Sequence, residues 1–296
     1  MKQPVFTGSS VAIITPFTDS GAVNYEELGN LIEFQIENHT DSITICGTTG
    51  EGSTLSDAEH REAMRYCIDV VAGRVPVIAG TGSNDTAYAL ELSQFACEAG
   101  ADALLMVTPY YNKTSQRGLV HHYEYLADRV SKPIIIYNVP SRTGMSIQAE
   151  TYYELSKHPN INGVKEASGD FTLIAHTRHL CGDELNIWSG NDDQVVPLLS
   201  LGGKGVVSVA ANIIPRQMHD MVALYMAGEI EKSSELQINL YDLLHSLFLE
   251  VNPIPVKTAA ALIGFKPGEL RLPLYQMSDA NLEKLKSAMR AAGLNV

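Results

Sequence analysis

The sequence alternates short apolar runs with longer amphipathic stretches, and this repetition constrains the fold more than any other feature. Eight apolar runs recur at roughly 28-residue intervals, and each gap is long enough for one helix. Strands that alternate with helices in this way predict repeated βαβ units and a parallel sheet. The runs occupy residues 11–14, 43–45, 75–79, 103–107, 134–136, 163–164, 185–188 and 206–209.

Eight βα units predict an α/β fold, the (β/α)8 TIM barrel, whose active sites lie at the carboxyl ends of the strands. A doubly wound open sheet is the alternative, but the turn after Ile14 reads Thr-Pro-Phe-Thr-Asp-Ser-Gly and is no glycine-rich nucleotide loop. From about Gly228 onward the pattern is helical and no strand signal interrupts it. We therefore expect a catalytic barrel at residues 1–228 and a helical C-terminal extension at residues 229–296.

Three helix starts can be read from capping residues. Ser56 and Glu59 form a capping box, and Asn24 precedes an apolar stripe that fits one helical face. Asn84 is expected to open a helix that ends at Gly100. Each of these helices has one apolar face to place against the sheet.

Charge and composition exclude several classes of function. Lysine and arginine number 21 against 34 aspartates and glutamates, a net charge of −13 without a basic cluster, which disfavours nucleic acid as a partner. No run of eighteen apolar residues and no signal-peptide pattern occur, so we expect a soluble, cytoplasmic protein with no membrane partner. The four cysteines form no C-x-x-C pair, which argues against zinc, iron–sulfur clusters and disulfides.

The lysine at position 165 ends an apolar run, where a buried strand should stop. An ammonium placed there loses hydration, so its pKa falls and the neutral amine becomes a nucleophile toward a carbonyl. A solvated strand flank or an ion-pair partner is the alternative interpretation of Lys165. Because side chains alternate along strands, Tyr137 and Lys165 are expected to point inward at similar heights on adjacent strands. A phenol in that position can shuttle protons while an imine forms.

Other polar residues follow the predicted strands. The turn at residues 47–50 offers N–H groups and two hydroxyls that suit a carboxylate, although tight strand-to-helix packing is the alternative interpretation. Arg142 is either a carboxylate clamp or a surface ion-pair partner. The histidines are expected to be surface residues rather than metal ligands, because no carboxylate completes a set. They are His121, His122, His176 and His179.

A sugar-phosphate enzyme is a second possibility for such a barrel. The stretch Gly-Gly-Lys-Gly at residues 202–205 faintly resembles a phosphate loop, but it precedes a strand and lacks the hydroxyl residue after its lysine. This function would need catalytic carboxylates at strand ends, for which Glu51 and Glu166 are the only candidates. Strand parity turns Glu166 away from the barrel interior.

Five segments match a known family in combination. They are Gly47-Thr-Thr-Gly-Glu51, Thr108-Pro-Tyr-Tyr-Asn112, Tyr137-Asn-Val-Pro140 with Arg142-Thr-Gly144, Val164-Lys-Glu-Ala-Ser168 and Ser189-Gly-Asn-Asp192. Together they resemble the signature of the dihydrodipicolinate synthase family, within the superfamily of pyruvate-dependent lyases that includes N-acetylneuraminate lyase. The resemblance extends from Gly8 to beyond Lys257.

The resemblance implies a Schiff base between Lys165 and pyruvate, with no metal and no organic cofactor. Tyr137, Thr48 and Tyr111 match the family's proton relay, and Tyr111 is expected to reach the active site of a neighbouring subunit. It also implies self-association, as a homotetramer built from two dimers. The residues that would contact pyruvate are Thr48 and Thr49 at its carboxylate, with Gly190 and Val207 lining the pocket.

Arg142 decides between subfamilies. An arginine at this position implies binding of the carboxylate of aspartate 4-semialdehyde, whereas sialic-acid lyases lack it. The resemblance therefore favours lysine and diaminopimelate biosynthesis over sugar-acid cleavage by another pyruvate-dependent class I aldolase. A non-catalytic pyruvate or lysine sensor would be expected to have lost Lys165 or Tyr137, and both are present.

The family's lysine effector site is only partly matched. His60, Asn84 and Tyr110 agree with it, but Tyr88 stands where an acidic residue would hold the effector's ammonium, and Asp57 replaces a histidine. Losing a charge-assisted contact weakens binding by on the order of 2 kcal/mol or more. We therefore predict an enzyme that lysine does not inhibit.

Overall fold

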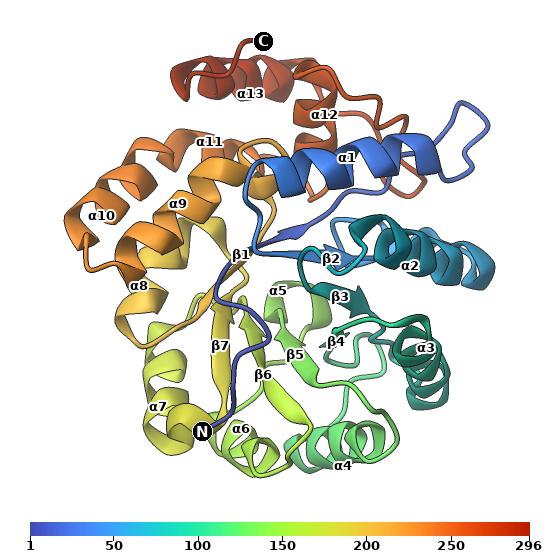
Figure 1. Cartoon of the computed structure of the whole chain (residues 1–296), viewed down its shortest axis with the longest axis vertical. Helices are drawn as coiled ribbons and strands as arrows, with labels where there is room; N and C mark the ends of the chain where they lie inside the picture. The colour runs from blue at the N-terminus through green and yellow to red at the C-terminus, as the bar shows by residue number, and fades with distance from the viewer.

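Eight parallel strands close into a barrel in the computed structural model, which describes all 296 residues (Figure 1). Each strand pairs with the next along the chain, and β1 pairs with β8 to complete the ring. The predicted (β/α)8 barrel is thus confirmed. The strands are β1 (Gly8–Ala12), β2 (Ser42–Ile45), β3 (Val77–Gly80), β4 (Ala103–Val107), β5 (Ile134–Asn138), β6 (Ile161–Glu166), β7 (Asn186–Ser189) and β8 (Gly205–Ser208).

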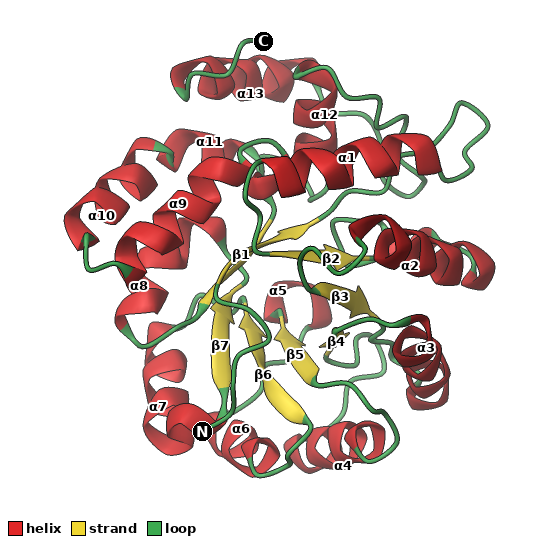
Figure 2. Ribbon diagram, viewed as in Figure 1, coloured by secondary structure: helices red, strands yellow, loops and turns green.

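Helices surround the strands on the outside, as the red and yellow ribbons of Figure 2 show. Those of the barrel are α1 (Tyr25–Glu37), α2 (Asp57–Val71), α3 (Thr86–Ala99), α4 (Gln116–Ala127), α5 (Pro140–Thr143), α6 (Ala149–Ser156), α7 (Phe171–Cys181), α8 (Val195–Ser200) and α9 (Pro215–Met226). Short 3-10 helices are η1 (Gly52–Thr54), η2 (Gly182–Glu184), η3 (Asp192–Gln194) and η4 (Ala210–Asn212).

Four more helices follow α9, as the sequence pattern predicted. They are α10 (Ile230–Asn239), α11 (Tyr241–Ser246), α12 (Ile254–Leu262) and α13 (Asp279–Ala291). In Figure 1, α12 and α13 lie beside α1, and the ring of Phe265 after α12 packs edge-on against Phe34 of α1 at 5.1 Å. The exact division of the chain at residue 228 stays a prediction. No helix is both long enough and apolar enough to cross a membrane.

A strand can extend beyond its apolar run where small polar residues continue it. Strand β1 begins at Gly8, three positions before the predicted start, because Ser9 and Ser10 extend it. Both serines are fully buried, and the Ser10 hydroxyl lies 2.9 Å from the Thr44 hydroxyl of β2. Hydroxyls that satisfy each other can occupy a barrel interior without large apolar side chains.

Two separate apolar cores stabilise the molecule. The larger lies between the strands and the surrounding helices, and the smaller fills the barrel interior. In the inner core the ring of Phe6 stacks on Trp188 with centroids 5.1 Å apart. The indole nitrogen of Trp188 donates to the Phe6 carbonyl oxygen at 3.2 Å, so the N-terminal segment is tied to this core.

Two predictions about local structure are wrong. Helix α3 is capped by Asp85, whose carboxylate accepts from the N–H of Ala87 at 2.9 Å, while Asn84 donates instead to the Tyr110 carbonyl oxygen. His122 is buried, and burial lowers its pKa to about 4. Its ring lies 2.9 Å from the Thr86 hydroxyl, a partner on another helix that sequence spacing could not identify. The other three histidines are exposed as expected.

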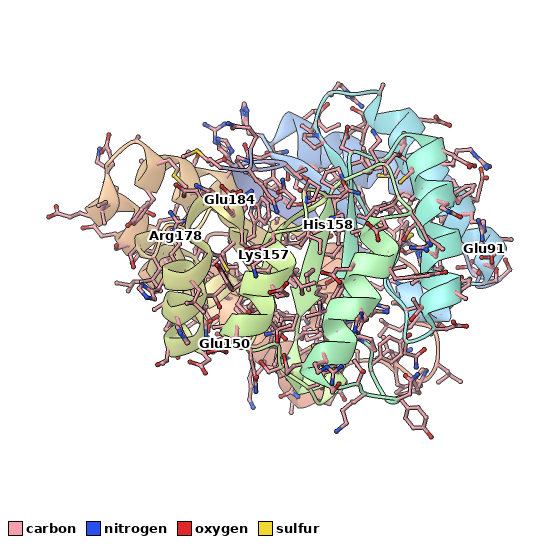
Figure 3. The ribbon with its side chains drawn as sticks, turned by 90° about the horizontal axis from the view of Figure 1, so that it is seen from below. Glu91, Glu150, Lys157, His158, Arg178 and Glu184 are labelled. Carbon is pink, nitrogen blue, oxygen red and sulfur yellow. The ribbon has the colours of Figure 1, made fainter.

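Charged side chains lie on the outer surface of the helical layer. Figure 3 labels several, including Glu91 of α3 and Lys157 at the end of α6. Glu91 pairs with Arg61 of α2 at 2.9 Å, and Lys157 pairs with Glu154 at 2.6 Å. Exposed pairs of this kind contribute little to stability because water screens them.

Candidate active site

Lys165 and Tyr137 lie side by side on neighbouring strands, as parity predicted. The register pairs Tyr137 of β5 with Lys165 of β6, and both side chains are buried. The Lys165 Nζ lies 4.3 Å from the centre of the Tyr137 ring. The buried amine therefore faces the aromatic ring rather than open water.

Burial makes the Lys165 amine reactive. It lowers the pKa of Lys165 from 10.5 to about 8, with the nearby Asp192 carboxylate raising that pKa and the Arg142 guanidinium lowering it. At pH 7 a lysine with this pKa is about 9% neutral, roughly 300-fold more than an unperturbed lysine. The site thus supplies the nucleophile that imine formation requires.

Asp192 is a site residue to which the sequence analysis gave no role. It follows β7 in η3, is buried, and its Oδ2 accepts from the N–H groups of Val209 at 3.0 Å and Ala210 at 2.8 Å. Its Oδ1 is buried without a hydrogen-bond partner. Burial raises the pKa of Asp192, while the nearby Ser208 side chain, these two hydrogen bonds and the Lys165 charge lower it. Its position as the acidic residue of the Ser189-Gly-Asn-Asp192 segment could have identified Asp192 from the sequence.

The turn after β2 is flanked by two residues with strained backbone conformations. Cys46 and Glu51 flank it with φ angles of 58° and 52°, in the left-handed region where non-glycine residues are uncommon. The Thr48 side chain lies near the Tyr137 phenol; burial raises the pKa of Tyr137, and the Arg142 charge and the Thr48 side chain oppose the rise. Thr49 is buried, and its hydroxyl accepts from the Asn252 amide at 3.0 Å. The structure therefore joins this turn to Tyr137.

The turn ends in a buried ion pair with the C-terminal helices. The Lys257 Nζ of α12 donates to Glu51 Oε1 at 2.7 Å, and the two side chains are only 2% and 1% exposed. The other oxygen, Glu51 Oε2, accepts from the N–H of Arg271 at 3.0 Å. Burial lowers the pKa of Lys257, and Glu51 opposes this shift. Sequence spacing gave no indication of this pair.

Glu166, the other carboxylate considered for phosphate chemistry, lies outside the barrel interior as predicted. Its oxygens accept from the Tyr152 hydroxyl at 2.8 Å, the Asn138 amide at 3.0 Å and the N–H of Ser168 at 2.8 Å. Glu51 and Glu166 are thus both committed to structural contacts. The sugar-phosphate alternative has no free acid or base at either position.

Arg142 lies on α5, at the edge of a cavity of about 480 Å³ that Thr48 and Tyr137 also line. Its Nη2 donates to the Asn252 carbonyl oxygen at 3.1 Å. Two other predicted residues, Gly190 and Val207, do not line this cavity. A Cβ on Gly190 would lie 3.2 Å from the Lys165 Cε, and Val207 is buried in the inner core with Tyr137.

Tyr111 is not part of the site within one chain. It follows β4 with a φ of 65° and is 93% exposed. A large aromatic ring held away from its own barrel in a left-handed backbone conformation is costly unless something covers it. The intrasubunit structure therefore does not bring Tyr111 to Lys165.

Of the predicted effector residues, His60 and Tyr110 line the same cavity together with Tyr88, and Asn84 donates to the Tyr110 carbonyl oxygen at 3.2 Å. The His60 Nε2 is 2.8 Å from the Gly80 carbonyl oxygen, and burial lowers the pKa of His60. The Tyr88 hydroxyl donates to Asp57 Oδ1 at 3.2 Å. Tyr88 and Asp57, the two residues that depart from the family pattern, are thus hydrogen-bonded to each other.

Comparison with known proteins identifies the family. The model of the "Dihydrodipicolinate synthetase family" matches residues 5–292. The 4-hydroxy-tetrahydrodipicolinate synthase of Thermoanaerobacter sp. (strain X514) is 58% identical over 293 residues, covering 99% of this chain and 98% of that protein. The enzyme of that name from Caldicellulosiruptor saccharolyticus is 55% identical over 294 residues, covering 99% of both chains.

Solved structures agree closely. The dihydrodipicolinate synthase of Aquifex aeolicus superposes with a TM-score of 0.95 at 44% identity, covering 98% of this chain and 99% of that one. The one from Thermotoga maritima gives a TM-score of 0.96 at 40% identity, with 98% and 100% coverage. The signature segments, the barrel and these full-length matches agree, and the chain belongs to the dihydrodipicolinate synthetase family.

Proposed function

We propose that this chain condenses pyruvate with aspartate 4-semialdehyde through a Schiff base on Lys165, the activity of a 4-hydroxy-tetrahydrodipicolinate synthase in lysine and diaminopimelate biosynthesis. The observation that carries the proposal is a buried amine, with its pKa lowered to about 8, against the ring of Tyr137. The relatives of that name, 58% identical across the chain, support the same activity.

The first half-reaction follows from the chemistry of the lysine. Neutral Lys165 attacks the pyruvate ketone, and loss of water leaves a protonated imine. This imine acts as an electron sink, so a methyl proton of pyruvate can leave and give an enamine. Tyr137 and Thr48 lie near each other in the wall of the same cavity and can pass these protons. We assign the third relay position to Tyr111 of a neighbouring subunit.

The two substrates both carry carboxylates, and each needs its own positive or N–H-rich site. Thr48 and Thr49 are proposed to hold the pyruvate carboxylate, with Gly190 and Val207 closing the pocket around the lysine. Arg142 then binds the carboxylate of aspartate 4-semialdehyde. The enamine carbon attacks the aldehyde, and the product amine displaces Lys165 as the ring closes.

Self-association is part of the proposal because Tyr111 requires a partner. A homotetramer of two dimers is the arrangement that we propose. A structure with 40% identity and a TM-score of 0.96 is described as a monomeric dihydrodipicolinate synthase variant, so the fold is compatible with more than one assembly. The cytoplasmic location stays a prediction.

We also propose that lysine does not regulate this enzyme through His60, Asn84 and Tyr110. The Tyr88 hydroxyl occupies one oxygen of Asp57, and Arg61 donates to both oxygens of the same carboxylate at 3.0 and 2.9 Å. The Asp57 charge is thus already paired with Arg61, and Tyr88 has no charge to offer an ammonium.

Borohydride trapping tests the function directly. The protein is reduced with borohydride in the presence of pyruvate, and the modified peptide is mapped by mass spectrometry. We expect an adduct on Lys165 whose yield falls when aspartate 4-semialdehyde, but not N-acetylmannosamine, is added before the reductant. Lys165→Arg is the control and should give no adduct. Discharge by N-acetylmannosamine instead would support the sugar-acid lyase, and an unmodified Lys165 would refute Schiff-base chemistry.

A further inference from the structure

One residue of the C-terminal extension touches both proposed carboxylate sites. Asn252, in the segment between α11 and α12, is buried, and its side-chain Nδ2 donates to Thr49 Oγ1 at 3.0 Å. Its peptide oxygen accepts from Arg142 Nη2 at 3.1 Å. Thr49 and Arg142 belong to different βα loops of the barrel, and Asn252 lies 203 positions beyond Thr49 in the sequence.

The hydrogen bond from Asn252 determines what the Thr49 hydroxyl can do. A hydroxyl has one hydrogen to donate and two lone pairs that accept. With one lone pair occupied by the Asn252 amide, the hydrogen of Thr49 is directed elsewhere and is free for an anionic acceptor. An amide donor at this place therefore makes Thr49 a hydrogen-bond donor, which is what a carboxylate ligand needs.

Stability alone does not explain Asn252. Its Oδ1 is buried and has no hydrogen-bond partner, an arrangement that costs folding free energy. An apolar residue of similar size would avoid this cost. The buried amide uses its NH2 group as a donor but leaves its oxygen without a partner, which indicates that the donor is needed. The side-chain acceptor of this NH2 group is the Thr49 hydroxyl.

The same loop is held at a second point, which keeps Thr49 within reach of Asn252. Glu51 is two residues after Thr49, and its carboxylate is fixed by Lys257 at 2.7 Å, five residues after Asn252. Asn252 and Lys257 of the extension thus each contact the turn through their side chains. Motion of the turn away from the extension would break both.

We propose that Asn252 is a positioning residue that polarises Thr49 for the pyruvate carboxylate while its peptide oxygen orients Arg142. The proposal deepens the function given above and rests on it. Asn252 does not touch the reacting atoms. It acts through Thr49, so removing it should weaken pyruvate binding more than it slows the chemistry on bound pyruvate.

The experiment measures the pyruvate concentration that gives half-maximal borohydride trapping on Lys165. Asn252→Ala should raise this concentration about 5-fold, the effect expected for one neutral hydrogen bond. Asn252→Asp should raise it more, roughly 30-fold, because an aspartate would accept the Thr49 hydrogen and repel the pyruvate carboxylate. The maximal adduct yield at saturating pyruvate should stay near that of the unmodified protein in both variants.

Variants of Thr49 separate this role from a structural one. Thr49→Ser keeps the hydroxyl and should lose less pyruvate affinity than Thr49→Val, which should weaken binding at least as much as Asn252→Ala. The double variant Thr49→Val with Asn252→Ala should bind pyruvate as tightly as Thr49→Val alone. In Thr49→Val the Asn252 amide already has no hydroxyl to polarise, so removing it changes nothing further. Asn239→Ala, at an exposed asparagine of the same extension, is the matched control and should change nothing.

The outcomes distinguish the two proposals. If the unmodified protein gives no pyruvate adduct, the proposed function fails. If it gives the adduct and Asn252→Asp binds pyruvate as tightly as Asn252→Ala, or Thr49→Val binds as tightly as the unmodified protein, the function stands and the role of Asn252 is wrong. Thr49→Val leaves Asn252 in place, so normal pyruvate binding by this variant would refute the role of Asn252 even if a variant of Asn252 does not fold.

Discussion

Replacing Lys257 with methionine tests the buried ion pair that ties the C-terminal helices to the turn after β2. Methionine has a similar length and fills the same space, so the packing changes little. What remains is Glu51, 1% exposed, with the N–H of Arg271 at 3.0 Å as its surviving partner. Removing one member of a buried pair typically costs about 3–5 kcal/mol, because the other charge stays buried without compensation.

The free energy of unfolding is measured by urea titration followed by circular dichroism, at one protein concentration for all variants. We expect Lys257→Met to lose about 3–5 kcal/mol. Adding Glu51→Gln should restore at least half of that loss, since the buried charge is then gone while the amide oxygen of the new side chain still accepts from the N–H of Arg271.

Lys157→Met is the matched control. Its ammonium lies 2.6 Å from Glu154, but both side chains are about half exposed, so the free energy of unfolding should hardly change. Equal losses for Lys257→Met and Lys157→Met would refute the argument from burial. So would a double variant that is less stable than Lys257→Met alone.

Three further predictions concern the site. Asp192→Asn should lower the pH of half-maximal pyruvate trapping below about 8, since the Asp192 charge raises the pKa of Lys165; a shift to higher pH would contradict the assignment. Tyr111→Phe should lower turnover roughly 100-fold. Mixing Tyr111→Phe subunits with Lys165→Ala subunits should restore activity, because the Lys165 of the first subunit and the Tyr111 of the second can form an intact shared site. No recovery of activity would refute sharing. Submillimolar lysine should leave the reaction rate unchanged, and Tyr88→Glu should introduce inhibition; half-inhibition of the unmodified enzyme would contradict this.

The contacts that could be predicted from the sequence are those that depend on local regularities, such as the alternation of side chains along a strand. Side chains alternate along a strand, and consecutive strands of a βα barrel are neighbours, so the pairing of Tyr137 with Lys165 follows from two local rules. The outward position of Glu166 follows from the same parity. Capping by Ser56 and Asn24 is equally local, because each cap depends on residues at most three positions away.

The contacts that escaped prediction depend on elements distant in sequence. Nothing near Lys257 or Asn252 reveals that α12 lies against the turn at Thr49, and the two hydrogen bonds involved span 206 and 203 positions. His122 shows the same limit, since its burial depends on Thr86 of another helix. The role of Asp192 was missed because a loop carboxylate gains meaning only when the segment after β8 supplies the N–H groups beside it.

The closure of the ring by β1 and β8 has a consequence for the making of the protein. Strand β8 ends at Ser208, and the partner of Glu51 comes later still, at Lys257. A growing chain therefore carries an open sheet edge and an unpaired acidic side chain until most of it has been synthesised. At roughly 5–20 residues per second, this interval lasts on the order of 10 s or longer. During it the ribosome-bound chain is vulnerable to edge pairing and to chaperone capture, and we expect enzymatic activity only after Lys257 has been synthesised.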